Sequence, residues 1–213
     1  VDIDLNERGR LQAAQLAQAL AAHKPELTGY NFFVSPQLRA QDTMKAIATA
    51  QGRDLASIVT DTRLREIGFG EWEGKPFWEL KASPIYPADP EGRYYWRPEG
   101  GESYEDGVVR VESFLAELTG PTLIVSHGAV GRCLMGHVAS LPPERINATP
   151  PCRHADGCSR NGRKAGGRHR DYPLAVGRQR RPCDQEQVGK AAGRLCYRFN
   201  NQAIAYTEVQ EVA

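Results

Sequence analysis

The sequence has 213 residues, of which 40% are hydrophobic and 25% charged, with a formal net charge of +1 at pH 7. This length supports one sizeable domain with a hydrophobic core, and the composition is typical of globular proteins in water. No apolar run reaches the roughly 18 residues of a membrane helix, and no signal peptide is recognisable, so we expect no membrane partner. Five cysteines without regular spacing argue against a disulfide framework and favour a reducing, cytoplasmic setting.

The small net charge hides two regions of opposite sign. Residues 147–196 hold 11 Lys and Arg against 4 Asp and Glu, whereas the rest of the chain holds 16 against 22. Residues 147–196 also contain few large apolar side chains and show no helical or strand period. They cannot bury enough surface to offset the entropy of ordering them. We therefore expect a folded body over residues 1–146, a basic irregular insert over 147–196, and a C-terminal hairpin of the same domain over 197–213.

Helices alternate with short strands in the first part of the chain. Asn6 is suited to cap a helix that ends near His23, because apolar residues between them recur at spacings of three and four. Residues 30–34 predict a strand, which is followed by a second helix, and residues 57–60 predict the next strand. This order indicates a doubly wound α/β protein.

The middle of the chain predicts two irregular segments. Three glycines among aromatic and acidic residues over 64–74 indicate a shaped loop. The proline-rich and aromatic stretch over 78–95 indicates a loop that covers or lines a pocket. Ser103 then begins a helix, and Asp106 three residues later completes a capping box.

The strongest local signal is the strand over residues 122–126 and the turn that follows it. Its unbroken apolar run is typical of a strand covered on both faces by helices. His127 would then lie at the carboxyl edge of a parallel sheet, where ligands bind. Gly128 opens the next helix, whose first N–H groups favour an anion. This pattern suggests phosphate chemistry, and the alternative is a histidine that only caps a helix.

Two further features point to an anion site. Arg39 lies in the first turn of the second helix, where the helix dipole disfavours a cation unless an anion binds there; the alternative is an ordinary exposed arginine. The loop over 64–74 carries three acidic residues. Burial of one of them would raise its pKa and suit it to proton donation, whereas the others would be solvated.

Five short motifs together resemble the histidine phosphatase superfamily, also called phosphoglycerate mutase-like, and they occur in its order. They are Leu5-Asn6-Glu7-Arg8-Gly9, Ser35-Pro36-Gln37-Leu38-Arg39-Ala40, residues 64–74 with Glu66, Gly101-Glu102-Ser103 and Val125-Ser126-His127-Gly128. The resemblance implies a three-layer α/β/α sandwich with a mostly parallel sheet. It also implies phosphoryl transfer through a phosphohistidine on a small phosphorylated metabolite, without metal or cofactor.

The resemblance also assigns roles to residues. Arg39, His127 and Gly128 correspond to phosphate-binding positions, and a protonated His127 would stabilise charge on the transferring phosphoryl group. Glu66 corresponds to the general acid that protonates the leaving oxygen. Glu66, Phe69 and Ala129 correspond to substrate-contacting positions.

One motif of the family has no counterpart in the sequence. The family's nucleophilic histidine lies in an Arg-His-Gly motif, and no such tripeptide occurs among the 213 residues. We therefore expect that an N-terminal piece is absent and that this chain does not form the covalent intermediate. We also expect a gap, or badly packed backbone, beside Arg39, Glu66 and His127, where the strand that carries the nucleophile would lie.

Several alternatives stay open. A phosphatase is favoured over a mutase, because the segment over 74–100 is short for a cap that retains a bisphosphate. A catalytically silent phosphate-binding module is the other reading of residues 1–146. The unusual composition of residues 147–196 suggests an out-of-frame translation. The sequence indicates neither the substrate nor the oligomeric state.

The basic insert raises two rival functions, and both are weak. Cys152, His154, Cys158 and Cys183 are residue types of a zinc site, but they lack paired CxxC spacing, so we expect no metal. The arginines over 178–181 are not interleaved with aromatic residues, so a nucleic-acid partner is disfavoured.

Overall fold

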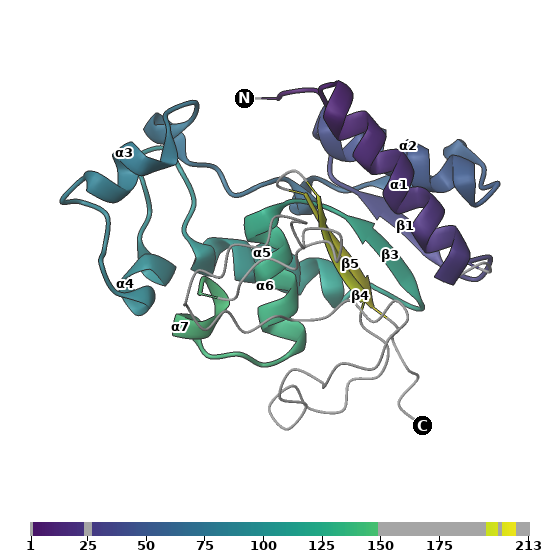
Figure 1. Ribbon diagram of the computed structural model, residues 1–213. Coiled ribbons are helices and arrows are strands. Elements are labelled where there is room, and N and C mark those ends of the chain that lie inside the picture. Colours follow the sequence, from purple (N-terminus) through teal and green to yellow (C-terminus); the bar gives the residue numbers. More distant parts are fainter. Residues whose placement is uncertain (1, 24–26, 149–194, 200–201, 208–213) are drawn as a thin grey trace, which may run out of the picture.

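The computed structural model describes residues 2–23, 27–148, 195–199 and 202–207 (Figure 1). Most of the basic insert lies outside the described residues. The residues considered above for a zinc site and for nucleic-acid binding also lie outside them. Of the described helices, none is long and apolar enough to cross a membrane. Within the same ranges, no cluster of three or more His, Cys, Asp or Glu is placed to hold a metal ion.

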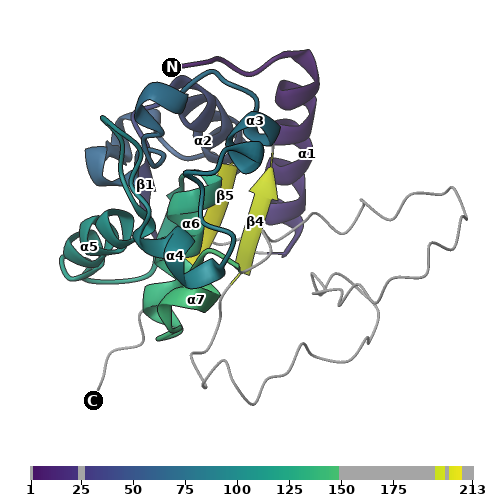
Figure 2. The same cartoon turned by 90° about the vertical axis from the view of Figure 1, so that its left-hand side faces the viewer.

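The described part of the chain forms three layers, as expected. A five-stranded sheet lies in the middle, with the strand order β2-β1-β3-β5-β4. Helices α1 and α2 cover one face, and α5 and α6 cover the other (Figures 1 and 2). The strands are β1 (Asn31–Val34), β2 (Ile58–Thr60), β3 (Thr122–Val125), β4 (Leu195–Phe199) and β5 (Gln202–Thr207). The main helices are α1 (Glu7–His23), α2 (Leu38–Ala50), α5 (Tyr104–Leu115) and α6 (Gly128–Val138).

Side chains that alternate along β1 and β3 build the two halves of the core. Phe32 and Leu123 point toward α1 and α2, whereas Phe33 and Ile124 point toward α5 and α6. A strand places successive side chains on opposite faces, so each strand contributes to both layers. Burying one such side chain stabilises the fold by about 1.5–3 kcal/mol. The unbroken apolar run that precedes His127 follows from this double burial.

The parallel pairing of β1 with β3 brings two predicted site segments to one edge. β1 also pairs in parallel with β2, and the register places Val34 beside Val125. Ser35 and His127 follow these strand ends, and their side chains meet at 2.7 Å between Ser35 Oγ and His127 Nε2. The expectation that both segments lie in one sheet, at the same edge, is therefore confirmed.

Capping side chains explain where two of the helices begin. Asn6 Oδ1 accepts a hydrogen bond from Gly9 N at 2.8 Å at the start of α1. Ser103 and Asp106 exchange side-chain and backbone hydrogen bonds at the start of α5, which is the predicted capping box. Each such cap is worth about 1 kcal/mol.

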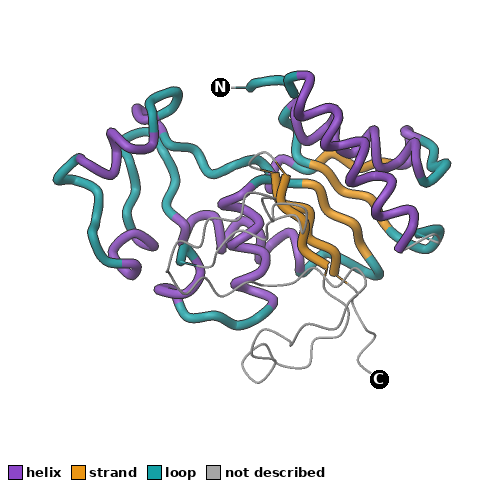
Figure 3. Tube along the Cα trace, in the orientation of Figure 1, coloured by secondary structure: helices purple, strands orange, loops and turns teal. Residues whose placement is uncertain are grey.

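The segment predicted as a loop over 78–95 contains two short helices instead. They are α3 (Phe77–Ala82) and α4 (Pro90–Tyr95), and they stand away from the sheet as a separate lobe (Figure 3). Asp89 caps α4, and Pro90 occupies its first turn, where a missing N–H costs nothing. A third short helix, α7 (Pro143–Ile146), was also not expected. Helices of one or two turns are too short to show an apolar period.

The gap that we expected beside His127 is not present. β3 is paired on both edges, with β1 on one side and antiparallel β5 on the other, and Val125 lies opposite Ile204. An unpaired strand edge exposes a row of N–H and C=O groups, and pairing with β5 satisfies them. β4 begins at Leu195, two residues before the boundary expected for the hairpin.

Candidate active site

A cleft of about 1110 Å³ opens at the carboxyl edge of the sheet. Residues from the N-terminal segment, the start of α2, the loop over 66–75, the α3–α4 lobe and α6 line it. Arg39, Glu66, Phe69, Gly128 and Ala129, which the sequence singled out, are among the lining residues. The cleft therefore brings together segments that are far apart in the sequence.

Gln37 connects Arg39 to the loop that carries Glu66. Its side-chain oxygen accepts hydrogen bonds from Arg39 Nη2 at 3.3 Å and from the backbone N of Glu66 at 2.9 Å. This one amide therefore holds the guanidinium beside the carboxyl-bearing loop. The role of Gln37 could not be predicted from the sequence, because a glutamine before a helix carries no signal of such a contact.

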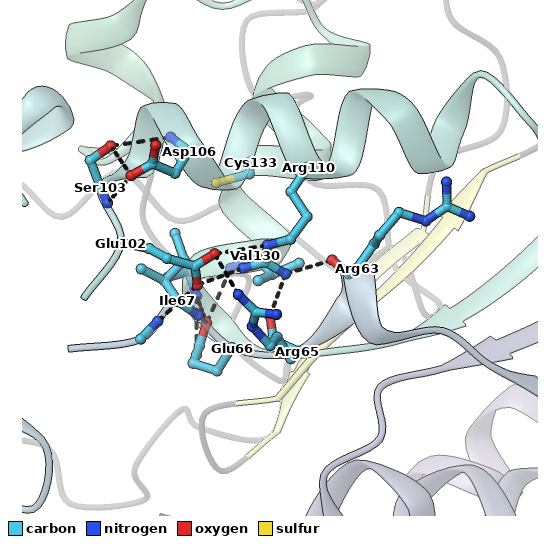
Figure 4. A network of polar contacts seen from close by, with 12 residues as sticks. Arg63, Arg65, Glu66, Ile67, Glu102, Ser103, Asp106, Arg110, Val130 and Cys133 are labelled. Atoms are coloured by element: carbon cyan, nitrogen blue, oxygen red, sulfur yellow. Dashed lines mark hydrogen bonds and ion pairs between the residues drawn. The ribbon is translucent and has the colours of Figure 1, made fainter. Parts of the chain in front are cut away.

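Glu66 occupies the N-terminus of α6. Its carboxylate accepts hydrogen bonds from Ala129 N at 3.2 and 3.3 Å, from Val130 N at 3.2 Å and from Ile67 N at 3.1 Å (Figure 4). Burial raises the pKa of Glu66, while these N–H groups and Arg39 lower it, and burial dominates. The anion that the helix N-terminus favours is thus, in this structure, the chain's own carboxyl group.

His127 differs from what the sequence suggested. It is fully buried and is not among the residues that line the cleft, and its Nε2 lies 2.7 Å from Ser35 Oγ. Burial, with repulsion from Arg39 and Arg110, lowers the pKa of His127 to about 3. Nδ1 is buried and has no hydrogen-bond partner among the described residues. In this structure His127 therefore does not line the cleft as Arg39 does, and its imidazole is neutral at pH 7.

A second carboxylate fixes the loop on which Glu66 lies. Glu102 accepts hydrogen bonds from Gly68 N at 3.1 Å, from Arg65 Nη2 at 3.0 Å and from Arg110 Nε and Nη2 at 3.2 and 3.1 Å (Figure 4). Arg110 also donates to the carbonyls of Arg63 and Arg65, at 2.6 and 2.8 Å. The backbone on both sides of Glu66 is thus held by one ion-paired cluster.

Glycine permits the close approach that closes this loop. Gly70 has a φ of 53°, and a Cβ at this position would lie 1.9 Å from the carbonyl oxygen of Glu99. Any other residue would push the loop away from the segment before Glu102. The glycines that suggested a shaped loop are therefore needed for its contact with the Glu102 region.

The far side of the cleft is an aromatic wall, made of Trp72, Phe77, Tyr86 and Trp96. Tyr86 makes edge contacts with Phe77 and Trp96, with ring centroids 6.0 and 5.1 Å apart. Lys75 lies 4.6 Å from the centre of the Trp72 ring, and Lys81 lies 5.0 Å from that of Phe77. Each lysine is within the range of a cation–π contact. This side of the cleft therefore consists of aromatic rings, two of which carry a lysine ammonium group over the ring face.

The fold and the cleft together define an α/β/α protein with an open ligand site at the carboxyl edge of its parallel strands. A family model described as Histidine phosphatase superfamily (branch 1) matches residues 1–169. The chain belongs to this superfamily, as its motifs suggested.

Individual relatives are phosphatases and mutases. The chain is 33% identical over 161 residues to the glucosyl-3-phosphoglycerate phosphatase of Mycolicibacterium vanbaalenii, an alignment that covers 67% of this chain and 66% of the relative. It is 28% identical over 158 residues to a 2,3-bisphosphoglycerate-dependent phosphoglycerate mutase of Gloeobacter violaceus, covering 68% of each. The chain thus spans about two thirds of the length of these relatives.

A solved structure shares the fold. The complex of a mycobacterial glucosyl-3-phosphoglycerate phosphatase with inorganic phosphate superposes with a TM-score of 0.59 and 29% sequence identity. The match covers 70% of this chain and 75% of that one.

Proposed function

We propose that this protein hydrolyses a phosphomonoester of a small metabolite in the cytoplasm, through a phosphohistidine intermediate and without a metal or other cofactor. The observation that carries the proposal is that Gln37 links Arg39 to Glu66 at the N-terminus of α6, the helix that His127 precedes. A cation and a carboxyl group with a raised pKa at this edge of the sheet supply the phosphate contact and the proton donor of phosphoryl transfer, but not its nucleophile. The phosphatases among the relatives support the same class of reaction.

Each group has a role in this reaction. Arg39 binds the phosphoryl oxygens, since its planar guanidinium suits bidentate contact with phosphate. The phosphorus–oxygen bond breaks as a histidine nitrogen bonds to phosphorus, and Glu66 gives its proton to the departing alcohol oxygen. Water then attacks the phosphohistidine, and Glu66 takes a proton back. Burial, which raises the pKa of Glu66, favours the protonated form that the first step requires.

We propose that the imidazole of His127 becomes protonated only when the substrate is bound. In the empty site, burial and the positive charge of Arg39 keep its imidazole neutral. A phosphate dianion bound at Arg39 would offset that repulsion and raise the pKa of His127, whose ring would have to turn into the cleft to contact it. The imidazolium would then stabilise charge on the equatorial oxygens.

The nucleophilic histidine is the part that the 213 residues do not supply, because they contain no Arg-His-Gly. We propose that residues 1–146 and 197–213 belong to one catalytic domain whose nucleophile lies upstream, with 147–196 as an insert. The chain alone is then inactive.

Hydrolysis of p-nitrophenyl phosphate tests this proposal. The chain as given and a version extended upstream are assayed side by side, each also as Arg39→Ala. We expect activity only in the extended version and a loss of two to three orders of magnitude in its Arg39→Ala variant, the size of one lost oxyanion contact. Full activity in the extended Arg39→Ala variant would remove Arg39 from the site.

Two other functions have specific support. Mutases occur among the relatives, and transfer of the phosphoryl group to a second metabolite rather than to water would favour that activity. A silent phosphate-binding module is favoured by the absence of Arg-His-Gly from the sequence. Phosphate binding without hydrolysis in the extended version would support it.

A further inference from the structure

The side chains of Ser35 and His127 meet inside the protein, just beyond the carboxyl ends of β1 and β3. Both residues are fully buried, and Ser35 Oγ lies 2.7 Å from His127 Nε2. The other ring nitrogen, Nδ1, is also buried and has no hydrogen-bond partner among the described residues. A buried polar atom without a partner is rare in folded proteins, so this nitrogen needs an explanation.

Three hydrogen bonds fix the position of Ser35. Its N–H donates to the carbonyl oxygen of Val125 at 3.0 Å, which continues the pairing of β1 with β3. Its own carbonyl oxygen accepts from Gln41 Nε2 at 2.7 Å, and its Oγ accepts from Gln37 N at 3.3 Å. The hydroxyl group is therefore held beside the imidazole before any ligand binds.

These contacts favour one of the two neutral forms of the ring. Among the described residues, the one acceptor that the Ser35 hydroxyl proton reaches is His127 Nε2. If the hydroxyl donates to Nε2, a single group is left without a partner, the Nδ1–H. If Nε2–H donates to Ser35 instead, two are left, the hydroxyl proton and the Nδ1 lone pair. Each unmade buried hydrogen bond costs free energy, so the Nδ1–H tautomer is favoured.

The imidazole lies next to the ligand cleft without lining it. Gly128, which follows His127 in the chain, lines the cleft. Gln37, whose N–H binds Ser35, lines it too. The side chain of Gln37 also binds Arg39, the proposed phosphate ligand. A donor without a partner beside such a site is suited to a phosphoryl oxygen, because charged oxygens accept the strongest hydrogen bonds.

We propose that Ser35 is a positioning residue for phosphoryl transfer, whose hydroxyl holds Nε2 of His127 and leaves Nδ1–H as the donor to an oxygen of the bound phosphoryl group. A hydroxyl both donates and accepts, so Ser35 donates to the neutral ring and accepts from Nε2–H once the ring is protonated. The contact therefore holds in both protonation states, and the ring turns toward the phosphate about it. The inference rests on the proposed function, because the phosphate at Arg39 supplies the acceptor for Nδ1–H.

NMR of the imidazole nitrogens in the 213-residue chain tests the hydrogen bond without a ligand. Nitrogen chemical shifts distinguish a protonated from an unprotonated ring nitrogen, and His127→Gln identifies the signals of His127. At pH 7 we expect the Nδ1–H tautomer in the wild type and in Ser35→Thr, which keeps the hydroxyl. Ser35→Ala should lose the preference for this tautomer.

Ser126→Ala is the matched control for this measurement. Ser126 is as buried as Ser35 and precedes His127, but its hydroxyl donates to the carbonyl oxygen of Leu64 at 2.7 Å. The variant should therefore keep the Nδ1–H tautomer. The Nε2–H tautomer in the wild type, or an Nδ1–H tautomer that survives Ser35→Ala, would overturn the inference.

Kinetics of the version extended upstream test the positioning role. On p-nitrophenyl phosphate, Ser35→Ala should lower kcat by about 10–100-fold, the size of one hydrogen bond to a charged group, and Ser35→Thr should restore part of it. KM should change little, because the contact serves charge that develops in the transition state. A role in stability alone would leave the kcat of the folded enzyme unchanged, and that result would overturn the positioning role. If the extended wild type is inactive, the proposed hydrolysis is wrong and the positioning role falls with it, whereas the NMR result still decides the hydrogen bond.

Discussion

The two sides of the cleft are held in different ways. At the sheet edge, polar side chains are fixed by contacts between distant parts of the sequence, as between His127 and Ser35 or between Glu66 and Ala129. The rings of the aromatic wall contact one another by their edges, α4 packs against α5 and α7, and Phe77 remains 51% exposed. One side is therefore fixed by hydrogen bonds to buried strand ends, and the other by packing at the surface.

This difference separates two tasks. Phosphoryl transfer needs charged groups held in place before the substrate arrives, because preorganised charge is what stabilises a transition state. Selection of the alcohol part needs only surfaces that fit, and loops on a fixed scaffold change at little cost in stability. Substitutions on each side of the cleft test this difference, and we expect the largest effects at the sheet edge.

The largest effect concerns Glu66. In a version of the protein extended upstream, Glu66→Gln should lower kcat/KM for an alkyl phosphate by about 10²–10⁴-fold, the usual contribution of a general acid. Hydrolysis of p-nitrophenyl phosphate should fall far less, because its leaving group needs little protonation. Glu112→Gln, an exposed carboxylate on α5, is the matched control. Equal losses on both substrates would remove Glu66 from the acid role.

The next effect concerns the ion-paired cluster that holds the Glu66 loop. Glu102→Ala should lower the free energy of unfolding by about 3 kcal/mol, because it leaves Arg110, whose side chain is 11% exposed, without its carboxylate. Denaturant unfolding measures the change.

Lys45→Ala provides the comparison for that measurement. It breaks the exposed Lys45–Asp42 pair, whose atoms lie 3.5 Å apart, and should cost less than about 1 kcal/mol. If the two variants lost equal stability, the Glu102 cluster would be no more than a surface ion pair.

A smaller effect should appear in the pH dependence of stability. The pKa of His127 is about 3 in the folded protein, below the ordinary histidine value of 6.5. Between these values the unfolded state binds more protons, so this contribution is complete above pH 6.5 and is lost as the pH falls. His127→Gln should flatten the dependence of unfolding free energy on pH between 5 and 6 by about 1.4 kcal/mol per pH unit. An unchanged slope would mean that His127 is not buried in its neutral form.

The sequence predicted the sheet edge better than the aromatic side, for physical reasons. The positions of Arg39, Glu66 and Gly128 near one sheet edge could be predicted, because the carboxyl ends of parallel strands lie at the same edge. The direction of the His127 ring could not be predicted, because it depends on Ser35, a partner on another strand.

Short helices and contacts between distant segments could not be predicted from the sequence, for related reasons. α3 and α4 are too short to show a helical period, and the pairing of β5 with β3 joins segments that are far apart in the chain. The contacts of Gln37 with Arg39 and with the backbone of Glu66 likewise appear only once the loop is folded.

The smallest effect should come from the aromatic wall, and a matched pair of phenylalanines makes the comparison direct. Phe77→Ala removes a half-exposed ring with one edge contact and should lower the free energy of unfolding by less than about 1 kcal/mol. Phe114→Ala removes a ring that is 1% exposed and packs edge-on against Phe33 at 5.2 Å, and should cost about 3–5 kcal/mol. Unfolding of both variants by denaturant measures the ratio. Similar losses would mean that the lobe is part of the cooperative core, and the division between a fixed sheet edge and a loosely held aromatic wall would fail.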